Sequence, residues 1–227
     1  MSSPESEINP VSRLVLTRER IVAAGVDLVD EGGPEALTMR AVAHRLRSGV
    51  MSLYRHVSGR EELLDLVLAT MAADVPQTEA VGEWRVDLAA VARDVRAGLL
   101  RRPHLTVLLT SRAGRGGAEV SMLERSFAIL RSAGFSPEEA VLVNHALGNY
   151  VAGAALWEAV GMAGATGAER TARREAVADA MAAMPADRYP SLTWVGRSIV
   201  AGTLEERFEF GLGALLDGFA IALDRRR

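Results

Sequence analysis

The sequence contains no cysteine and no lysine. The absence of cysteine excludes disulfides, thiolate metal sites and cysteine nucleophiles. All 26 basic residues are therefore arginine, a bias that the Arg, Ala and Gly codons of a GC-rich genome would explain. Aromatic residues make up only 5% of the chain, so alanine, leucine and valine must fill most of its core.

Long hydrophobic runs are absent as well. No stretch of about 18 uninterrupted apolar residues occurs, so no membrane-spanning helix and no membrane partner are expected. The N-terminal sequence MSSPESEINPVSR lacks the basic region and apolar run of a signal peptide. We therefore expect a cytoplasmic protein. A chain of 227 residues with 49% hydrophobic residues can hold one substantial domain, or a small one joined to a larger one.

Apolar residues recur at helical spacing along most of the chain, and alternating runs bounded by hairpin turns are lacking. We expect an all-α fold that follows a disordered tail at residues 1–16. Ser58 and Glu61 resemble a capping box that opens a helix, and Ser136 followed by Pro137 marks another helix start. Helices are predicted at 17–31, 38–46, 50–56, 60–75, 84–101, 104–112, 118–133, 136–161, 168–184 and 203–224.

One segment is strongly cationic. From Thr38 to Arg60 the chain has five arginines, two histidines and no acidic residue, although its formal net charge is −3. Duplex DNA attracts such a segment, because bound cations release the counterions condensed on its phosphates. Two short helices joined by a tight turn, with arginine and small polar residues on the second, fit a helix-turn-helix. The alternative is a solvent-exposed arginine face on an ordinary helical bundle.

The sequences LTMRAVAHRL and MSLYRHVSGREELLDLV resemble the DNA-binding domain of the tetracycline-repressor (TetR) family of bacterial regulators. The preceding TRERIVAAGVDLVDEGGPEALTM resembles the first helix of that domain. The resemblance implies an N-terminal three-helix helix-turn-helix domain at 17–62 and a larger C-terminal helical domain for ligand binding and dimerisation at 63–227. It also implies DNA contacts from Thr38, Arg40, Val50, Met51, Ser52, Tyr54, Arg55, His56 and Arg60.

The turn before the recognition helix departs from the family pattern. Where the family has glycine and a hydrophobic residue, this chain has Arg47 and Ser48. Glycine adopts a positive φ there at little cost, and arginine does not. Gly49 offers another place for the turn, which would change the register of the recognition helix and the role of Val50.

The sequences DRYPSL and RFEFGLGALLDGF resemble the C-terminal domain of the tetracycline repressors. This implies a small, largely apolar ligand between helices 60–75, 84–101, 118–133 and 136–161. Those repressors hold a magnesium–drug chelate through a histidine, but the aligned position here is near Thr110, so we expect neither tetracycline nor a metal or other cofactor. The candidate ligand-binding residues, which could equally be plain core, are Met71, Val91, Val95, Ser126, Phe127, Asn144, His145 and Asn149.

The family resemblance also implies a homodimer, because two recognition helices must lie ~34–36 Å apart to reach successive turns of DNA. Helices 136–161 and 203–224 would form a four-helix bundle with the partner, and Gly211 and Gly218 would let a partner helix approach closely. The alternative is that the apolar stripe of the last helix packs on its own subunit. The predicted stripe is Phe208, Leu212, Leu215, Phe219 and Leu223.

The function that follows is a DNA-binding transcription regulator, most often a repressor, released from a palindromic operator by the ligand. Its partners would be double-stranded DNA, a small-molecule effector and a second copy of the chain. No nucleophile–base pair, phosphate-binding loop or paired carboxylates indicate an enzyme. A dimeric ligand-binding protein without sequence-specific DNA binding and a TetR-type activator are the alternatives.

Overall fold

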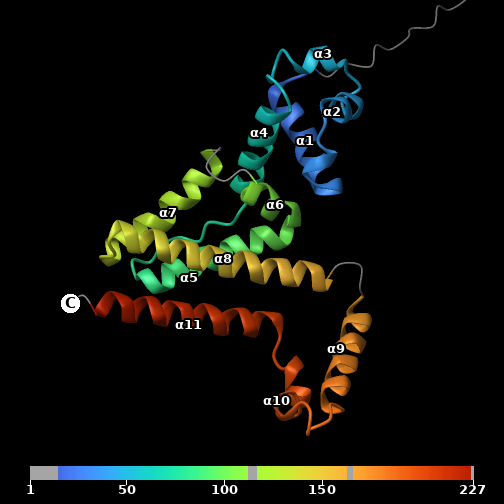
Figure 1. The fold of residues 1–227 in the computed structure, drawn as a ribbon. Helices are drawn as coiled ribbons and strands as arrows, with labels where there is room; N and C mark the ends of the chain where they lie inside the picture. The colour runs from blue at the N-terminus through green and yellow to red at the C-terminus, as the bar shows by residue number, and fades with distance from the viewer. Residues whose placement is uncertain (1–14, 112–116, 163–165, 226–227) are drawn as a thin grey trace, which may run out of the picture. The chain divides into compact units, whose positions relative to one another are not determined.

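The computed structural model describes residues 15–111, 117–162 and 166–225, and every regular element in them is a helix (Figure 1). The predicted all-α fold is confirmed. The chain divides into two compact units, Met1–Thr70 and Met71–Arg227. Residues 1–14 of the predicted tail lie outside the described part.

The helices are α1 (Arg18–Gly32), η1 (Pro34–Ala36), α2 (Met39–Arg45), α3 (Val50–Leu53), α4 (Arg60–Ala73), α5 (Trp84–Arg101), α6 (Pro103–Ser111), α7 (Gly117–Ala133), α8 (Pro137–Met162), α9 (Gly167–Ala182), α10 (Pro190–Val195), η2 (Gly196–Val200) and α11 (Leu204–Asp224).

The first unit is built around α1, with α2 and α4 packed against it. Thr17 and Thr38 are the N-caps of α1 and α2, and their hydroxyls accept hydrogen bonds from the backbone N–H groups of Arg20 and Ala41. Such caps satisfy backbone donors that have no partner inside the helix. The side chains that close the core of this unit are 0% exposed: Ile21, Val29, Leu37, Val42, Leu53, Leu63 and Val67.

The start of α4 is as predicted, but Ser58 pairs with the residue after the expected one. The backbone N–H and the hydroxyl of Ser58 donate to Oε2 of Glu62, at 2.6 and 2.7 Å, so the expected pairing with Glu61 is wrong. The helix begins at Arg60, and this places Glu62 over Ser58. These two hydrogen bonds, that of the backbone first, lower the pKa of Glu62. Arg18 of α1 pairs with the same carboxylate and ties the two helices together.

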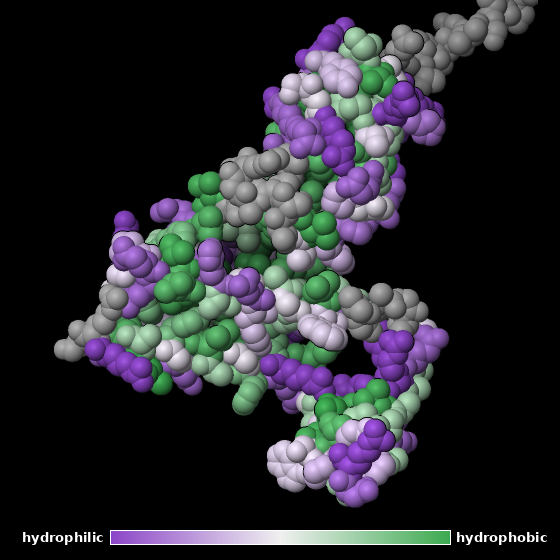
Figure 2. Space-filling model, viewed as in Figure 1, coloured by the Kyte–Doolittle hydropathy of each residue, from purple (hydrophilic) through white to green (hydrophobic). Residues whose placement is uncertain are grey.

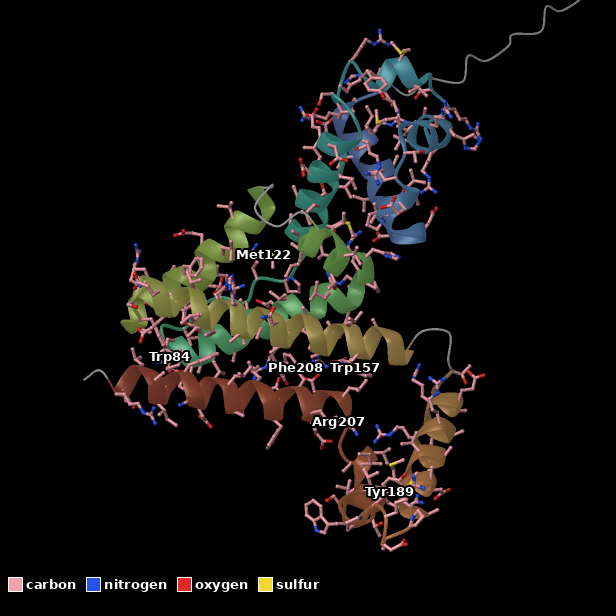
Figure 3. The ribbon with its side chains drawn as sticks, in the orientation of Figure 1. Trp84, Met122, Trp157, Tyr189, Arg207 and Phe208 are labelled. Carbon is pink, nitrogen blue, oxygen red and sulfur yellow. The ribbon has the colours of Figure 1, made fainter. Side chains whose placement is uncertain are left out.

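In the second unit, α5, α8 and α11 pack against one another, and α6 and α7 lie beside α5 and α8 (Figure 1). Phe208 of α11 lies at the contact between α8 and α11 (Figure 3) and stacks on Tyr150, with ring centroids 5.5 Å apart. The Tyr150 hydroxyl donates to the carbonyl of Phe208 at 2.7 Å. A Cβ at Gly211 would lie 2.3 Å from that hydroxyl, so this glycine admits a side chain of its own subunit.

Arginines of α5 fasten α11 along its length. Arg96 is 8% exposed, and its guanidinium donates to both carboxylate oxygens of Glu158 on α8, at 2.8 and 3.0 Å. It also lies over the Phe208 ring, 4.4 Å from the centroid. Burial alone would lower the pKa of Arg96, but hydrogen bonds to Glu158 and Glu205 raise it overall. The α5–α11 ion pairs run antiparallel along the two helices: Arg85–Asp217, Arg93–Glu209 and Arg96–Glu205.

The segment after α8 is more structured than predicted. A helix was expected at 168–184 and is found as α9, but the sequence analysis missed α10 and η2, which pack on it. Arg197 of η2 pairs with Glu175 and Asp179 of α9. Hydrophobic side chains show on the surface of this segment, at the lower right of Figure 2. Trp194 of α10 is 87% exposed.

The predicted dimer stripe on α11 faces its own subunit in large part. Phe208, Leu212 and Leu223 are 2%, 1% and 8% exposed, so for these residues the alternative reading is correct. They are buried because this apolar side of α11 packs against α5 and α8, and the ion pairs to α5 lie along the same contact. Leu215 and Phe219 are half-buried at the edge of the same face.

The crossing of α1 and α4 depends on Gly25. A Cβ at this position would lie 2.7 Å from Cγ2 of Val67 and 3.2 Å from Cδ1 of Leu37. Val67 is β-branched and fully buried, so it has little freedom to move. We expect Gly25→Ala to lower the free energy of unfolding by about 1–3 kcal/mol, despite the better helix propensity of alanine. Urea denaturation measures this loss.

The matched control is Gly25→Ala combined with Val67→Ala, which removes the clashing methyl groups. The two substitutions should couple favourably, so that the double variant is more stable than the sum of the single effects. Additive effects would show that the crossing does not depend on this contact.

Candidate nucleic-acid interface

Helix α2 presents one buried and one exposed face. Met39, Val42 and Ala43 are buried against the first unit. Arg40 and His44 lie on the opposite face and are exposed. The cap at Thr38 fixes the start of the helix, because its hydroxyl accepts from the Ala41 N–H at 3.1 Å. Thr38 is itself exposed, so the predicted contacts at Thr38 and Arg40 lie on the accessible face of α2.

The turn between α2 and α3 forms at Arg47. Its φ is +48°, and in the described chain it is the one residue other than glycine with a positive φ. The Ser48 N–H donates to the Ala43 carbonyl at 2.9 Å, and the Arg47 N–H donates to the His44 carbonyl at 3.1 Å. This is the bond pattern with which helices commonly end, although glycine is the usual residue in the left-handed position. Gly49 has φ −78°, so the turn does not form around it.

Helix α3 is a single turn, and three of the predicted recognition residues on it or directly after it are exposed. Leu53 is fully buried and anchors it. Met51 is 78% exposed and Tyr54 is 46% exposed. Arg55 is exposed as well. Three other candidates are half-buried: Val50 and Ser52 on α3, and His56 in the turn after it.

The five arginines of the cationic segment divide into two groups. Arg45 pairs with Glu31 and Asp27 of α1, and the hydrogen bond to Glu31 raises its pKa. Arg60 is held by backbone carbonyls and neighbouring carboxylates. The side chains of the other three have no ion pair or hydrogen bond with any described residue, so their charges are available to an anionic partner. These three are Arg40, Arg47 and Arg55.

Comparison with known proteins gives the family. Residues 21–67 match the model for bacterial regulatory proteins of the tetR family, and residues 75–223 match the tetracyclin repressor-like C-terminal domain. The chain belongs to the TetR family. The helix-turn-helix described above is therefore the DNA-binding domain of a transcription regulator.

Related TetR-family proteins cover nearly the whole chain. The HTH-type transcriptional repressor DrrR1 of Streptomyces coeruleorubidus is 34% identical, over 93% of this chain and 80% of that protein. The tetracycline repressor class G of Vibrio anguillarum is 29% identical, over 90% and 93%. The crystal structure of apo ActR from Streptomyces coelicolor superposes with a TM-score of 0.79 at 29% identity, covering 93% of this chain and 98% of that one.

The candidate ligand residues fall into three sets by exposure. Met71, Val91 and Ser126 are buried in the second unit, at 0%, 8% and 6% exposed. His145 and Asn149 were expected to point inward, and this is wrong within one copy of the chain, because both lie on the exposed face of α8. Their spacing of one helical turn was read correctly, but it does not tell which face of α8 is covered. The remaining candidates are half-buried: Val95, Phe127 and Asn144.

Two buried carboxylates near this region were not found by the sequence analysis. Asp94 of α5 accepts from the backbone N–H and the hydroxyl of Thr78, each at 2.8 Å, and from Arg125 of α7 at 2.9 Å. Asp87 accepts from the N–H of Val81 at 2.7 Å. Together they fasten the segment between α4 and α5 to the body of the second unit.

Within the described ranges of both units, no helix has the length and apolarity needed to cross a membrane.

The left-handed conformation of Arg47 has a testable cost. A residue with a Cβ is disfavoured there by about 1–2 kcal/mol, and glycine is not. We expect Arg47→Gly to raise the free energy of unfolding by about 1 kcal/mol, measured by urea denaturation without DNA. As a control, Gly49→Ser should change stability by less than about 0.5 kcal/mol, because the φ of Gly49 suits any residue and serine is a good N-cap. A loss of stability in Arg47→Gly would contradict this account.

Proposed function

We propose that two copies of the chain bind a palindromic operator as a repressor, and that a small, largely apolar molecule bound to the C-terminal unit releases the DNA. The observation that carries the proposal is the helix-turn-helix in which Arg40, Arg47 and Arg55 have no described partner. A paired arginine cannot neutralise phosphates without first giving up its carboxylate. The repressor DrrR1, which aligns over most of the chain, supports the sign of regulation.

Recognition of the operator would fall to α3 and the start of α2. Met51 is placed to meet thymine methyl groups and Ser52 offers hydrogen bonds to base edges, while the unpaired charge of Arg55 is available to phosphates. Tyr54 and His56 would contact phosphates at the groove wall, as the family resemblance implies. The alternative of a regulator without sequence-specific DNA binding rested on the unusual Arg47–Ser48 turn. It is not favoured, because α3 still forms directly after this turn.

The proposed dimer uses the outer faces of α8 and α11. Both helices expose large apolar side chains to water, which is unfavourable. Exposed apolar patches of this kind commonly mark protein interfaces. A second copy of the chain would cover them by forming a four-helix bundle, in which His145 and Asn149 would also be covered. The exposed residues are Val141, Leu142, Leu156, Phe210 and Ile221, at 44%, 68%, 56%, 82% and 55% exposed.

A small-molecule effector is supported by the relatives. ActR from Streptomyces coelicolor has been solved in complex with actinorhodin, and that structure is 29% identical to this chain with a TM-score of 0.78. An effector of this chain must bind the free form more tightly than the operator-bound form, because only a difference in affinity shifts the equilibrium. A compound that binds the chain but leaves operator affinity unchanged is therefore not its inducer.

The free arginines should set the salt dependence of DNA binding. Each phosphate contact contributes about 0.9 to the slope of log K against log salt concentration. In a dimer, Arg55→Gln should therefore reduce the slope by about 2 and weaken binding to an operator selected from random duplexes. Fluorescence anisotropy at several salt concentrations measures both quantities.

The matched control for this experiment is Arg45→Gln, which removes an arginine from the same segment. Because Arg45 is paired with Glu31 and Asp27, its loss should leave the slope nearly unchanged. Equal slopes for Arg55→Gln and the wild type would remove Arg55 from the DNA interface. Failure of the wild type to prefer any selected duplex over random DNA would defeat the proposed function as a whole.

The dimer is tested by placing a charge on its proposed interface. Phe210→Glu should convert a dimer into a monomer at micromolar concentration, because burying an unpaired carboxylate costs several kcal/mol. Val107→Glu on α6 is the control, since Val107 is 53% exposed outside the proposed interface and should leave the dimer intact. Sedimentation velocity gives the masses. A wild type that is monomeric, or a dimer of Phe210→Glu, would contradict the proposed interface.

A further inference from the structure

The guanidinium of Arg60 is occupied within the first unit. Its Nε–H donates to the carbonyl of Leu37 at 2.8 Å, and Nη2 donates to the carbonyl of Pro34 at 2.9 Å. On the remaining side, Nη1 lies 3.3 Å from a carboxylate oxygen of Glu61, and Nη2 lies 3.7 Å from one of Glu35. Two of the four contacts are therefore with backbone and two are with acidic groups. The side chain is 34% exposed.

The two carbonyls lie where the chain passes from η1 into α2. Pro34 begins η1, and Leu37 is the residue directly before Thr38, the N-cap of α2. Nε–H and one Nη–H of arginine point in parallel from the same edge of a rigid plane, so one guanidinium can bind two acceptors at a fixed separation. The ammonium group of lysine is a compact charge without this fork and cannot reproduce the geometry.

We propose that Arg60 is a positioning residue for DNA binding: it fastens the η1–α2 connection to α4 and so places Thr38 and Arg40 at the DNA. It is not itself a phosphate contact. A phosphate approaching the other edge of the guanidinium would meet the carboxylates of Glu35 and Glu61, whose charge repels it. This inference rests on the DNA binding proposed above and revises the direct backbone contact that the family resemblance implies for Arg60.

The experiment compares Arg60→Lys and Arg60→Gln with the wild type on the selected operator. Both variants lose the fork, so the η1–α2 connection must be ordered on binding, and both should bind about ten-fold more weakly. The slope of log K against log salt concentration should stay at the wild-type value, because no phosphate contact is lost. Arg40→Gln is the matched control: it should reduce that slope by about 2 per dimer while leaving the hydrogen bonds of Arg60 in place.

A second readout needs no DNA. Hydrogen exchange of the Ala41 and Val42 amides, which donate to the side chain and carbonyl of Thr38, should be faster in both Arg60 variants than in the wild type. A phosphate contact would leave this exchange unchanged. Unfolding of either variant in the absence of DNA would likewise support the role of Arg60 in holding the η1–α2 connection, since a phosphate contact contributes nothing to the free protein.

The opposite outcome is equally distinct. If Arg60→Lys binds and exchanges like the wild type while Arg60→Gln loses affinity and about 2 of the slope, Arg60 is a phosphate contact and the proposal is wrong. If both variants bind and exchange like the wild type, Arg60 has neither role. These results are separate from failure of the proposed function, in which the wild type itself would prefer no operator.

Discussion

The pairing of arginines with carboxylates decides which parts of this chain hold the fold and which can meet DNA. The chain has 26 basic and 29 acidic residues, so the average charge alone gives it no affinity for a polyanion. What matters is that the pairing is uneven. In the first unit, Arg45 is neutralised by α1 and Arg60 is held by carbonyls, while Arg40, Arg47 and Arg55 are left without a described partner. An acidic protein can therefore present a local cationic surface.

The same interaction has the opposite role in the second unit. There, three arginines of α5 meet three carboxylates of α11 in antiparallel order, and Arg96 is further tied to Glu158. Surface ion pairs contribute little individually, but the buried Arg96–Glu158 pair would be costly to break, because either partner alone would be a buried charge. Burial of the apolar face sets the rotation of α11, and the ion pairs add to it. Phe208 and Leu212 lie inward, while Phe210 faces out, where a second chain can reach it.

The sequence was sufficient for most local signals, although it paired Ser58 with Glu61 instead of Glu62. Caps at Thr38 and at Ser136, where the hydroxyl accepts from the Glu139 N–H at 3.3 Å, were predictable because capping needs only near neighbours in the chain. The helix-turn-helix was predictable for the same reason, together with the family resemblance. The inward face of α11 was not, since it depends on packing against α5, whose residues Arg85 and Arg93 pair with α11 from more than 100 positions away in the sequence. The prediction that His145 and Asn149 point inward was also wrong. Because α8 has apolar residues on every side, its sequence does not show which side is covered.

Arg47 brings the fold and the function into direct competition. Glycine would suit the left-handed turn better, and the chain instead has a residue that is strained there. Arginine at this position adds a third exposed cation, in the turn between α2 and α3, and in the proposed complex this charge would face the phosphates. Strain that persists because it serves binding is expected at functional sites rather than in cores. The turn therefore trades stability for charge, and it can do so because the hydrogen bonds from Ser48 and Arg47 to the end of α2 hold its geometry without glycine.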